Sequence, residues 1–131
     1  MKRTKLPLSL AIIDIDNFKT INDTYGHLEG DRVLVELAGI FKTHARTCDT
    51  VIRWGGEEFA MILPETNKNG ALTFAECIRA LVECSDWRYR ITVCIGVTTV
   101  YQEQNADKIM SIAERALYMA KKNKTVVFLT E

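Results

Sequence analysis

Three features are scarce or missing in this chain of 131 residues, and each absence makes one class of function less compatible with the sequence. The four cysteines have no Cys-x-x-Cys spacing and the two histidines form no zinc pattern with them, so we expect reduced, mostly buried thiols. The 17 basic and 17 acidic residues cancel, so no broad basic field favours nucleic acid as a partner. No signal peptide and no apolar run of membrane length is recognisable. We expect a cytoplasmic location and no membrane contact within this segment. Whether a longer protein would be tethered to a membrane through another region is left open.

The chain has enough apolar residues for one hydrophobic core. Hydrophobic residues make up 47% of the sequence, and 131 residues are enough for a single core but few for two domains. No internal repeat or low-complexity stretch interrupts the pattern. We therefore expect one domain over residues 1–131.

Residues 55–59 read Gly-Gly-Glu-Glu-Phe and lie between two apolar runs of strand character, 51–54 and 59–63. The glycine pair predicts a hairpin, because both central residues of a tight primed turn need positive φ. Glu57 and Glu58 would then lie near the hairpin tip, where adjacent carboxylates repel each other unless a cation or a proton-transfer role compensates. An ordinary solvated hairpin is the alternative, and this pentapeptide alone does not decide between them.

A second acidic cluster favours chemistry. Asp14 and Asp16 end the apolar run 8–13, which reads as a buried strand. Acids at the end of a core strand are costly to desolvate unless they are paired, and Mg²⁺ is a common partner in phosphate chemistry. A short helix is expected to begin at residues 17–19, where free backbone N–H groups and Lys19 could receive phosphate oxygens. This order of features resembles a nucleoside triphosphate site.

Two segments carry a family resemblance. Residues 14–31 read DIDNFKTINDTYGHLEGD and residues 53–59 read RWGGEEF. Together they resemble the GGDEF family of diguanylate cyclases, in its GGEEF variant, and the resemblance extends more loosely to residues 116–121.

The resemblance implies a reaction and a metal site. Two GTP molecules, one on each of two facing domains, would condense to cyclic di-GMP with release of pyrophosphate. Asp14, the carbonyl of Ile15 and Glu57 match the metal positions, for Mg²⁺ or Mn²⁺. Glu57 also matches the residue that accepts the proton of the attacking 3′-hydroxyl, and Glu58 would support a second metal. Lys19 matches a transition-state position, although a solvated helix lysine is the alternative.

The resemblance also implies how substrate is bound. Asn22 and Asp31 match the pair that reads guanine, and an ionised carboxylate complements the N1–H and N2–H donors of guanine better than the edge of adenine. Helix-end and capping roles for these two residues are the alternatives. His27 is a third substrate-side position, or else a partly buried loop histidine. The remaining candidate substrate residues lie at the phosphate end of the site: Asn17, Phe18 and Lys121.

Residues 46–49 read Arg-Thr-Cys-Asp and match the family's Arg-x-x-Asp inhibitory site, at the expected distance before the glycine pair. A guanidinium fork binds phosphate or the Hoogsteen edge of guanine in two places at once. Arg46 and Asp49 would therefore hold cyclic di-GMP as an inhibitor. A helix end followed by a surface turn also often carries both residue types.

Three departures from the family pattern keep a second hypothesis open. The printed sequence begins almost at the first expected strand, so we expect it to lack the family's preceding helix, its Asp-x-Leu-Thr-Gly-Leu segment and a sensory domain, although activity is expected to need a homodimer. Thr125 stands where the family has arginine and Lys124 where it has glycine, which predicts weaker GTP affinity. The segment 85–90 is short, and we expect a trimmed loop away from the catalytic cluster. The alternative is a weak or inactive module that binds GTP or cyclic di-GMP; another palm-like cyclase or polymerase fragment is disfavoured by Asn22, Asp31 and residues 46–49.

The rest of the chain predicts a scaffold of helices and strands. Strands are expected at 91–97 and 126–129, and Asn105 or Asp107 is expected to open a long helix. The fold class implied by the resemblance is α+β and palm-like, with a mostly antiparallel central sheet flanked by helices. Two further helices should turn apolar faces to that sheet, one with Val33, Leu34, Leu37, Ala38 and Phe41 and the other with Leu72, Ala75, Ile78, Leu81 and Val82.

Overall fold

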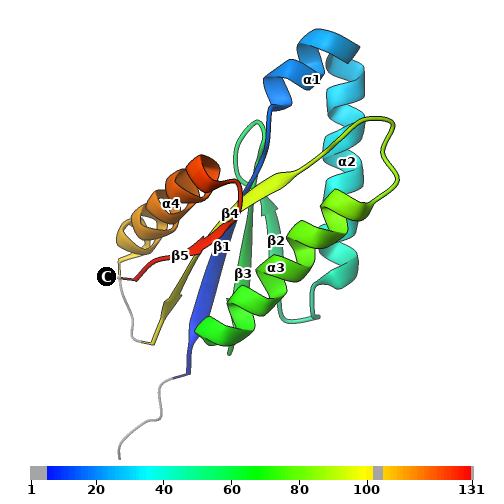
Figure 1. Cartoon of the computed structure of the whole chain (residues 1–131). Helices are drawn as coiled ribbons and strands as arrows, with labels where there is room; N and C mark the ends of the chain where they lie inside the picture. The colour runs from blue at the N-terminus through cyan, green and yellow to red at the C-terminus, as the bar shows by residue number, and fades with distance from the viewer. Residues whose placement is uncertain (1–5, 102–104, 131) are drawn as a thin grey trace, which may run out of the picture.

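Within the part of the chain that the structure describes, five strands form one sheet in the order β2-β3-β1-β4-β5, and only the β4–β5 pair is parallel. The structure is a computed structural model that describes residues 6–101 and 105–130. The α+β class and the mostly antiparallel sheet are as predicted. The elements (Figure 1) are β1 Leu8–Ile15, α1 Phe18–Tyr25, α2 His27–His44, β2 Thr50–Arg53, β3 Glu58–Pro64, α3 Lys68–Cys84, β4 Val93–Val100, α4 Ala106–Asn123 and β5 Val126–Phe128.

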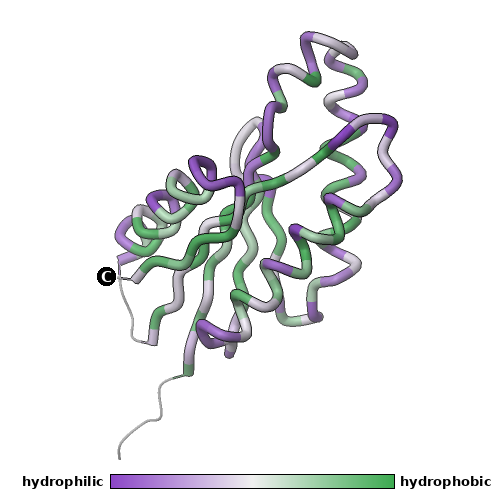
Figure 2. The backbone as a smooth tube through the Cα atoms, viewed as in Figure 1, coloured by the Kyte–Doolittle hydropathy of each residue, from purple (hydrophilic) through white to green (hydrophobic). Residues whose placement is uncertain are grey.

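Alternation along β1 divides the core between the two faces of the sheet. Ala11, Ile13 and Ile15 belong to the larger cluster, which includes the inner faces of α2 and α3. Ile12 belongs to the smaller cluster beneath α4. Figures 1 and 2 show α4 on one side of the sheet, α2 and α3 on the other, and hydrophobic residues along the strands between them. The predicted helix faces are confirmed, except that Ala38, Leu72 and Leu81 are only partly buried.

Gly96 lets α4 lie directly on β4. A Cβ atom at Gly96 would lie 2.2 Å from the backbone nitrogen of Leu117 and 2.6 Å from the carbonyl oxygen of Ala113. Both atoms belong to the backbone of α4, so a side-chain rotation cannot relieve the overlap. The spacing between helix and sheet therefore depends on this glycine.

The β2–β3 hairpin is where the sequence predicted it, but its turn is different. Gly55 and Gly56 have no positive φ, so the predicted tight primed turn is wrong. The connection runs over residues 54–57, and the Arg53 guanidinium donates hydrogen bonds to the carbonyl oxygens of both glycines, at 3.3 and 2.8 Å. The backbone N–H groups of Trp54 and Gly55 both donate to the Glu58 carbonyl. A longer turn held by an arginine replaces the two-residue turn.

The prediction of mostly buried thiols is wrong. Of the four cysteines, which are all free, only Cys94 is buried, while Cys48, Cys77 and Cys84 are exposed. None of the helices in residues 6–101 and 105–130 combines the length and apolar character that crossing a bilayer requires.

Lys124 ends α4 in the left-handed conformation, with φ 52°. This conformation favours glycine, because a Cβ atom crowds the backbone there. We expect Lys124→Gly to raise the free energy of unfolding by about 0.5–1 kcal/mol, as part of the gain is offset by the flexibility of glycine in the unfolded chain. Urea unfolding would measure this.

The matched control is Lys122→Gly, two residues earlier and in the last turn of α4. A glycine at this helical position is expected to lower the free energy of unfolding by up to about 1 kcal/mol. If both glycine variants were destabilised alike, the strain assigned to Lys124 would be wrong.

Candidate active site

Asp14, at the end of β1, is the buried acid of the site. The strand register places it opposite Glu58 on β3 and Cys94 on β4, and only 2% of the residue is exposed. Its Oδ2 accepts a hydrogen bond from Lys121 Nζ at 2.8 Å. Its Oδ1 is buried and has no hydrogen-bond partner among the described residues. A buried carboxylate oxygen without a partner is unfavourable, and a bound cation would remove that penalty.

Glu57 and Glu58 lie beside this acid. The backbone N–H of Ile15 donates to the carbonyl of Glu57, at 3.4 Å. Burial, and then the charge of Asp14, raise the pKa of the Glu57 carboxyl, and the same two causes raise the pKa of Glu58. Lys121 partly offsets both effects, and its own pKa is raised by its hydrogen bond to Asp14. Glu57, which was predicted to lie near Asp14, is therefore close enough for the charge of Asp14 to act on it, and so is Glu58.

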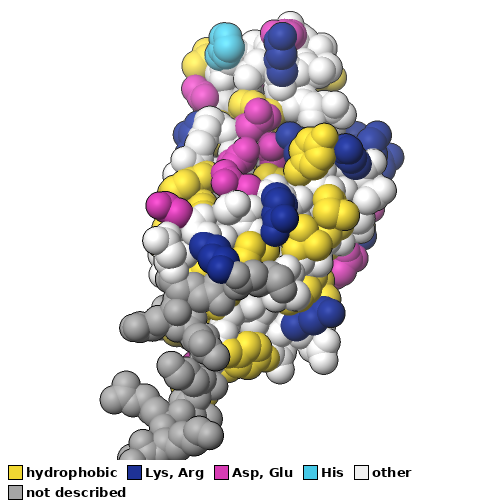
Figure 3. Space-filling model, turned by 90° about the vertical axis from the view of Figure 1, so that its left-hand side faces the viewer, with side chains coloured by type: hydrophobic (Ala, Val, Ile, Leu, Met, Phe, Trp, Pro, Cys, Tyr) yellow, Lys and Arg dark blue, Asp and Glu magenta, His cyan; other side chains and the backbone are white. Residues whose placement is uncertain are grey.

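The donor set of this cluster fits a hard divalent cation. Two carboxylates, from Asp14 and Glu57, and the carbonyl oxygen of Ile15 are the all-oxygen ligands that Mg²⁺ or Mn²⁺ prefers. Figure 3 shows acidic side chains gathered on the face of the molecule that carries α4, with basic side chains beside them. Within the described ranges, no three His, Cys, Asp or Glu side chains are grouped closely enough to hold an ion by themselves. The carbonyl is thus needed beside the two carboxylates, and the metal roles stay predictions.

Asp16 does not join this cluster. Its carboxylate accepts hydrogen bonds from Thr92 Oγ1 at 2.7 Å and from Cys94 Sγ at 3.0 Å. Burial, followed by this hydrogen bond, raises the pKa of the Cys94 thiol to about 12, so the thiol keeps its proton. Asp16 therefore links the end of β1 to β4, a role that its position beside Asp14 in the sequence does not reveal.

The connection from β1 into α1 leaves backbone donors available. Asn17 has a left-handed φ of 57° and its side chain makes no capping hydrogen bond to α1. The first N–H groups of the helix, from Phe18 onward, therefore have no side-chain cap and can receive an anion. Lys19 is exposed in the first turn. These placements agree with the expected phosphate end, and the binding roles stay predictions.

Asn22 lies against Gly30 where α1 meets α2. A Cβ atom at Gly30 would lie 1.8 Å from Asn22 Oδ1 and 3.2 Å from Phe18 Cζ. Asp31 is exposed on α2, and it does not cap the helix, because α2 begins at His27 after Gly26. His27 is exposed, so the partly buried loop histidine considered above is wrong. The capping alternative for Asp31 is also wrong, and Gly30 is a supporting residue that sequence reasoning missed.

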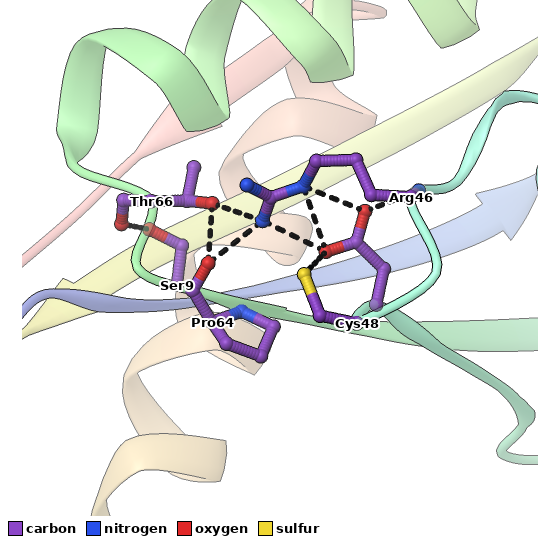
Figure 4. Close-up of polar contacts among 6 residues, drawn as sticks. Ser9, Arg46, Cys48, Pro64 and Thr66 are labelled. Atoms are coloured by element: carbon purple, nitrogen blue, oxygen red, sulfur yellow. Dashed lines mark hydrogen bonds and ion pairs between the residues drawn. The ribbon is translucent and has the colours of Figure 1, made fainter.

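Arg46 and Asp49 form a closed pair after α2. Arg46 Nη2 donates to Asp49 Oδ1 at 2.8 Å, and the Asp49 side chain is only 1% exposed. The same nitrogen donates to the Pro64 carbonyl and to Thr66 Oγ1, both at 2.7 Å (Figure 4). The buried Ser9 hydroxyl in turn donates to the Thr66 carbonyl. Arg46 is half exposed, so the pair is accessible, but part of its hydrogen-bonding capacity is already used.

This pair and the acidic cluster lie at opposite ends of β1. Pro64 pairs with Leu8 at the start of β1, whereas Glu58 pairs with Asp14 near its end. Six residues of strand place the two sites roughly 20 Å apart. A hollow of about 360 Å³ adjoins Arg46, between the ends of β3 and α2 and the start of α3.

Comparison with known proteins gives consistent results. The family model described as "Diguanylate cyclase, GGDEF domain" matches residues 1–126. Diguanylate cyclase A of Treponema denticola is 44% identical over 125 residues, covering 91% of this chain and 34% of that protein. The chain thus spans about a third of the length of that curated relative.

Two solved structures are similar along most of their length. The active GGEEF domain of a diguanylate cyclase from Vibrio cholerae has a TM-score of 0.90 and 35% identity, covering 96% of this chain and 85% of that one. The coiled coil and GGDEF domain of DgcB from Caulobacter crescentus, in complex with c-di-GMP, has a TM-score of 0.89 and 31% identity, covering 95% of this chain and 70% of that one.

Proposed function

The chain belongs to the GGDEF domain family of diguanylate cyclases, and on this premise we propose that it condenses two GTP molecules to cyclic di-GMP. The reaction would take place in a homodimer with one GTP on each domain. In each of two steps the 3′-oxygen of one GTP forms a bond to the α-phosphorus of the other, and pyrophosphate leaves. The proton of the 3′-hydroxyl passes to Glu57.

One observation supports this proposal most directly. Asp14 presents a buried, unpartnered carboxylate oxygen beside Glu57 and Glu58, whose pKa values are raised by burial and by the charge of Asp14. A fold gains nothing from burying one acid beside two partly exposed acids unless the cluster binds a cation or transfers a proton. Phosphoryl transfer with a divalent metal uses both.

The chain's own residues would then have distinct tasks. Asp14, the Ile15 carbonyl and Glu57 would hold Mg²⁺ or Mn²⁺, and Glu58 would support a second metal. When bound, the metal supplies charge neutralisation at the phosphate oxygens. Burial and the charge of Asp14 raise the pKa of Glu57, and a carboxylate with a raised pKa is a stronger base and so a better proton acceptor.

The triphosphate would lie between the start of α1 and the end of α4. The uncapped N–H groups after Asn17, including that of Phe18, and the side chain of Lys19 are available at one side. Lys121 is available at the other, although its ammonium group now contacts Asp14 and would have to exchange that partner for a phosphate oxygen. Thr125 supplies no positive charge at the family's arginine position, so GTP affinity should be low.

Asn22 and Asp31 would read the guanine, and Gly30 would keep Asn22 in place. In Gly30→Ala the added methyl group overlaps Asn22 Oδ1, at 1.8 Å, and the side chain has to turn away. We expect the Kd for GTP to rise between about 10- and 100-fold, as one polar contact of the base is lost and another is disturbed. Titration of the metal-loaded protein with GTP would measure this.

Gly39→Ala is the matched control for that experiment. Gly39 lies on the same helix, and a Cβ atom there would meet nothing within 4 Å. This variant should bind GTP like the wild type and gain up to about 1 kcal/mol in free energy of unfolding. Equal GTP affinity in Gly30→Ala and Gly39→Ala would remove Asn22 from the proposed guanine site.

The proposed inhibitory site is Arg46 with Asp49. Cyclic di-GMP binding there would have to replace part of the hydrogen bonds from Arg46 to Pro64 and Thr66. We expect Arg46→Ala to raise the concentration of cyclic di-GMP needed for half-inhibition by about tenfold or more. The initial rate of GTP turnover at increasing product concentration would measure it. Arg90→Ala, at an exposed arginine elsewhere, serves as the control, and unchanged inhibition in Arg46→Ala would exclude the site.

A second candidate function is a module that binds GTP or cyclic di-GMP without turnover. Thr125 in place of arginine favours it. The distinguishing experiment is incubation of the protein, fused to a dimerising segment if necessary, with GTP and Mg²⁺, followed by separation of the nucleotides. Formation of cyclic di-GMP supports the cyclase. GTP that binds but stays intact at every protein concentration supports the module.

A further inference from the structure

We infer that Tyr89 is a positioning residue for guanine recognition, because it clamps α1 to α2 on either side of the contact between Asn22 and Gly30. This inference rests on the proposed function, since it assigns a task within the same nucleotide site. The residue comes from the short segment between α3 and β4, some 60 positions away from the helices that it holds.

The corner formed by α1 and α2 needs such support. α1 has eight residues, of which only Ile21 is buried, and its first turn has no side-chain cap. Helices this short are unstable by themselves. The corner projects beyond the sheet, and α1 packs mainly on α2 (Figure 1). A helix with so little of its surface enclosed is free to shift unless another contact fixes it.

Tyr89 contacts both helices of the corner. Its ring stacks on Tyr25 of α1, with centroids 4.2 Å apart and planes 11° from parallel. Its hydroxyl donates a hydrogen bond to Glu29 Oε1 of α2 at 2.7 Å. Glu29 also accepts from Arg32, one turn further along α2. One side chain thus joins α1 and α2 by a ring contact and a charge-assisted hydrogen bond.

The protonation states keep this clamp in place over a wide range of pH. Hydrogen bonds from Arg32 and then Tyr89 lower the pKa of Glu29 to about 2. Burial and the hydrogen bond to Glu29 raise the pKa of Tyr89 to about 12. Tyr89 therefore remains a donor and Glu29 an ionised acceptor throughout the pH range in which the protein would work.

The two anchor points flank the proposed base-reading residues. Tyr25 follows Asn22 by three positions and lies on the same side of α1. Glu29 precedes Gly30, against which Asn22 packs, and comes two positions before Asp31. A shift of α1 relative to α2 would therefore change the distance between Asn22 and Asp31.

The other end of the connecting segment is fixed to α3. Trp87 Nε1 donates to the Val82 carbonyl at 2.8 Å, and the Trp87 side chain packs against the larger core cluster. Tyr89 is thus held by a rigid element. Residues 85–90 were expected to form a loop away from the catalytic cluster. They form a loop that contacts the α1–α2 corner through Tyr89. Among the described residues, this loop makes no contact with the acidic cluster.

Two variants separate the ring contact from the hydrogen bond. Tyr89→Leu removes both, and Tyr89→Phe keeps the ring but removes the bond to Glu29. Arg90→Leu is the control, because Arg90 lies on the same segment but pairs with Glu83 of α3. The Kd values of GTP and of inosine triphosphate, which lacks the guanine amino group, would be measured on the full chain with Mg²⁺, together with KM and kcat for GTP.

We expect Tyr89→Leu to raise the Kd and KM for GTP about tenfold, and Tyr89→Phe about threefold, because a smaller fraction of the protein has the binding geometry. The Kd for inosine triphosphate should change less, so the preference for GTP falls. At saturating GTP, kcat should stay within about twofold of the wild type, because Asp14 and Glu57 are not affected. A purely structural role would lower activity with both nucleotides alike.

Hydrogen exchange on the nucleotide-free protein gives an independent readout. Amides of α1 should exchange about tenfold faster in Tyr89→Leu than in the wild type, while those of β1 and α4 keep their protection. Unchanged exchange in α1, or an unchanged preference for GTP, would overturn the clamp even if the wild type is an active cyclase. If the wild type itself bound no GTP, the proposed function would fall, and this inference with it.

Discussion

Glu57→Gln is expected to bind GTP but to form cyclic di-GMP at least about a hundredfold more slowly than the wild type. The amide is nearly the same size as the carboxylate, yet it accepts no proton and is a poorer ligand for a divalent cation. The negative charge of Asp14 repels the negative charge of Glu57, and the variant removes this repulsion. The fold should therefore be retained or slightly stabilised. Product formation would be followed by chromatography at saturating GTP and Mg²⁺, and folding by urea unfolding.

Glu114→Gln is the control for this experiment. Glu114 is an exposed acid on α4, close enough for its charge to raise the pKa of Glu58. The change therefore removes the same charge near the same cluster without touching a proposed ligand. It should keep most of the activity. A comparable loss in both variants would mean that the overall negative charge matters, and that Glu57 has no specific role.

Gly96→Ala is expected to lower the free energy of unfolding by about 3 kcal/mol or more, which is a large part of the stability of a domain of this size. The added methyl group would lie 2.2 Å from the backbone of α4, so the helix as a whole has to move away from β4. α4 carries Lys121, and its displacement should also weaken binding of the triphosphate. Urea unfolding followed by far-UV circular dichroism would measure the stability.

The same Gly39→Ala variant serves as a control here, since it adds one methyl group where there is space. A small effect in Gly96→Ala, within about 0.5 kcal/mol, would show that α4 can slide along the sheet. The close contact described between β4 and α4 would then not be a constraint on the fold.

Local patterns in the sequence predicted the elements of the fold. The apolar run before Asp14 is the central strand, and Asn105 caps α4 by accepting a hydrogen bond from the N–H of Asp107. The turn at Gly55 and Gly56 was predicted wrongly, because its conformation depends on the Arg53 guanidinium, which binds the carbonyl groups of both glycines. Turn type is decided by such contacts as well as by the two central residues.

The thiol prediction was wrong for a reason that the sequence itself contains. Cys77 and Cys84 are seven residues apart, and so they lie on one face of α3. Ala75 and Ile78 belong to the face that is buried against the sheet. The prediction relied on the general tendency of cysteine to be buried. The helical period, which places Cys77 and Cys84 on the exposed face of α3, would have given the right answer.

The acidic residues of the candidate site could be predicted from the sequence. The contacts that hold its helices in place could not. Asp14 and Glu57 were expected to meet because the resemblance to the GGDEF family assigns both residues to the metal site. The Tyr25–Tyr89 stack and the packing of Asn22 on Gly30 depend on how a loop and two helices meet in space. The contact of Lys121 with Asp14 joins residues 107 positions apart, and a local pattern contains no information about it.

Because Cys94 is buried, the reaction of its thiol with a reagent would show how often the surrounding part of the core opens. Three thiols are exposed and should react at once with a thiol reagent. Cys94 is buried in the core cluster between β1 and α4, and burial raises the pKa of its thiol to about 12. Modification of the fourth thiol therefore requires that the strand and the helix separate. The rate at which the last equivalent of reagent is consumed would measure how often this half of the core opens. No label has to be introduced for this measurement.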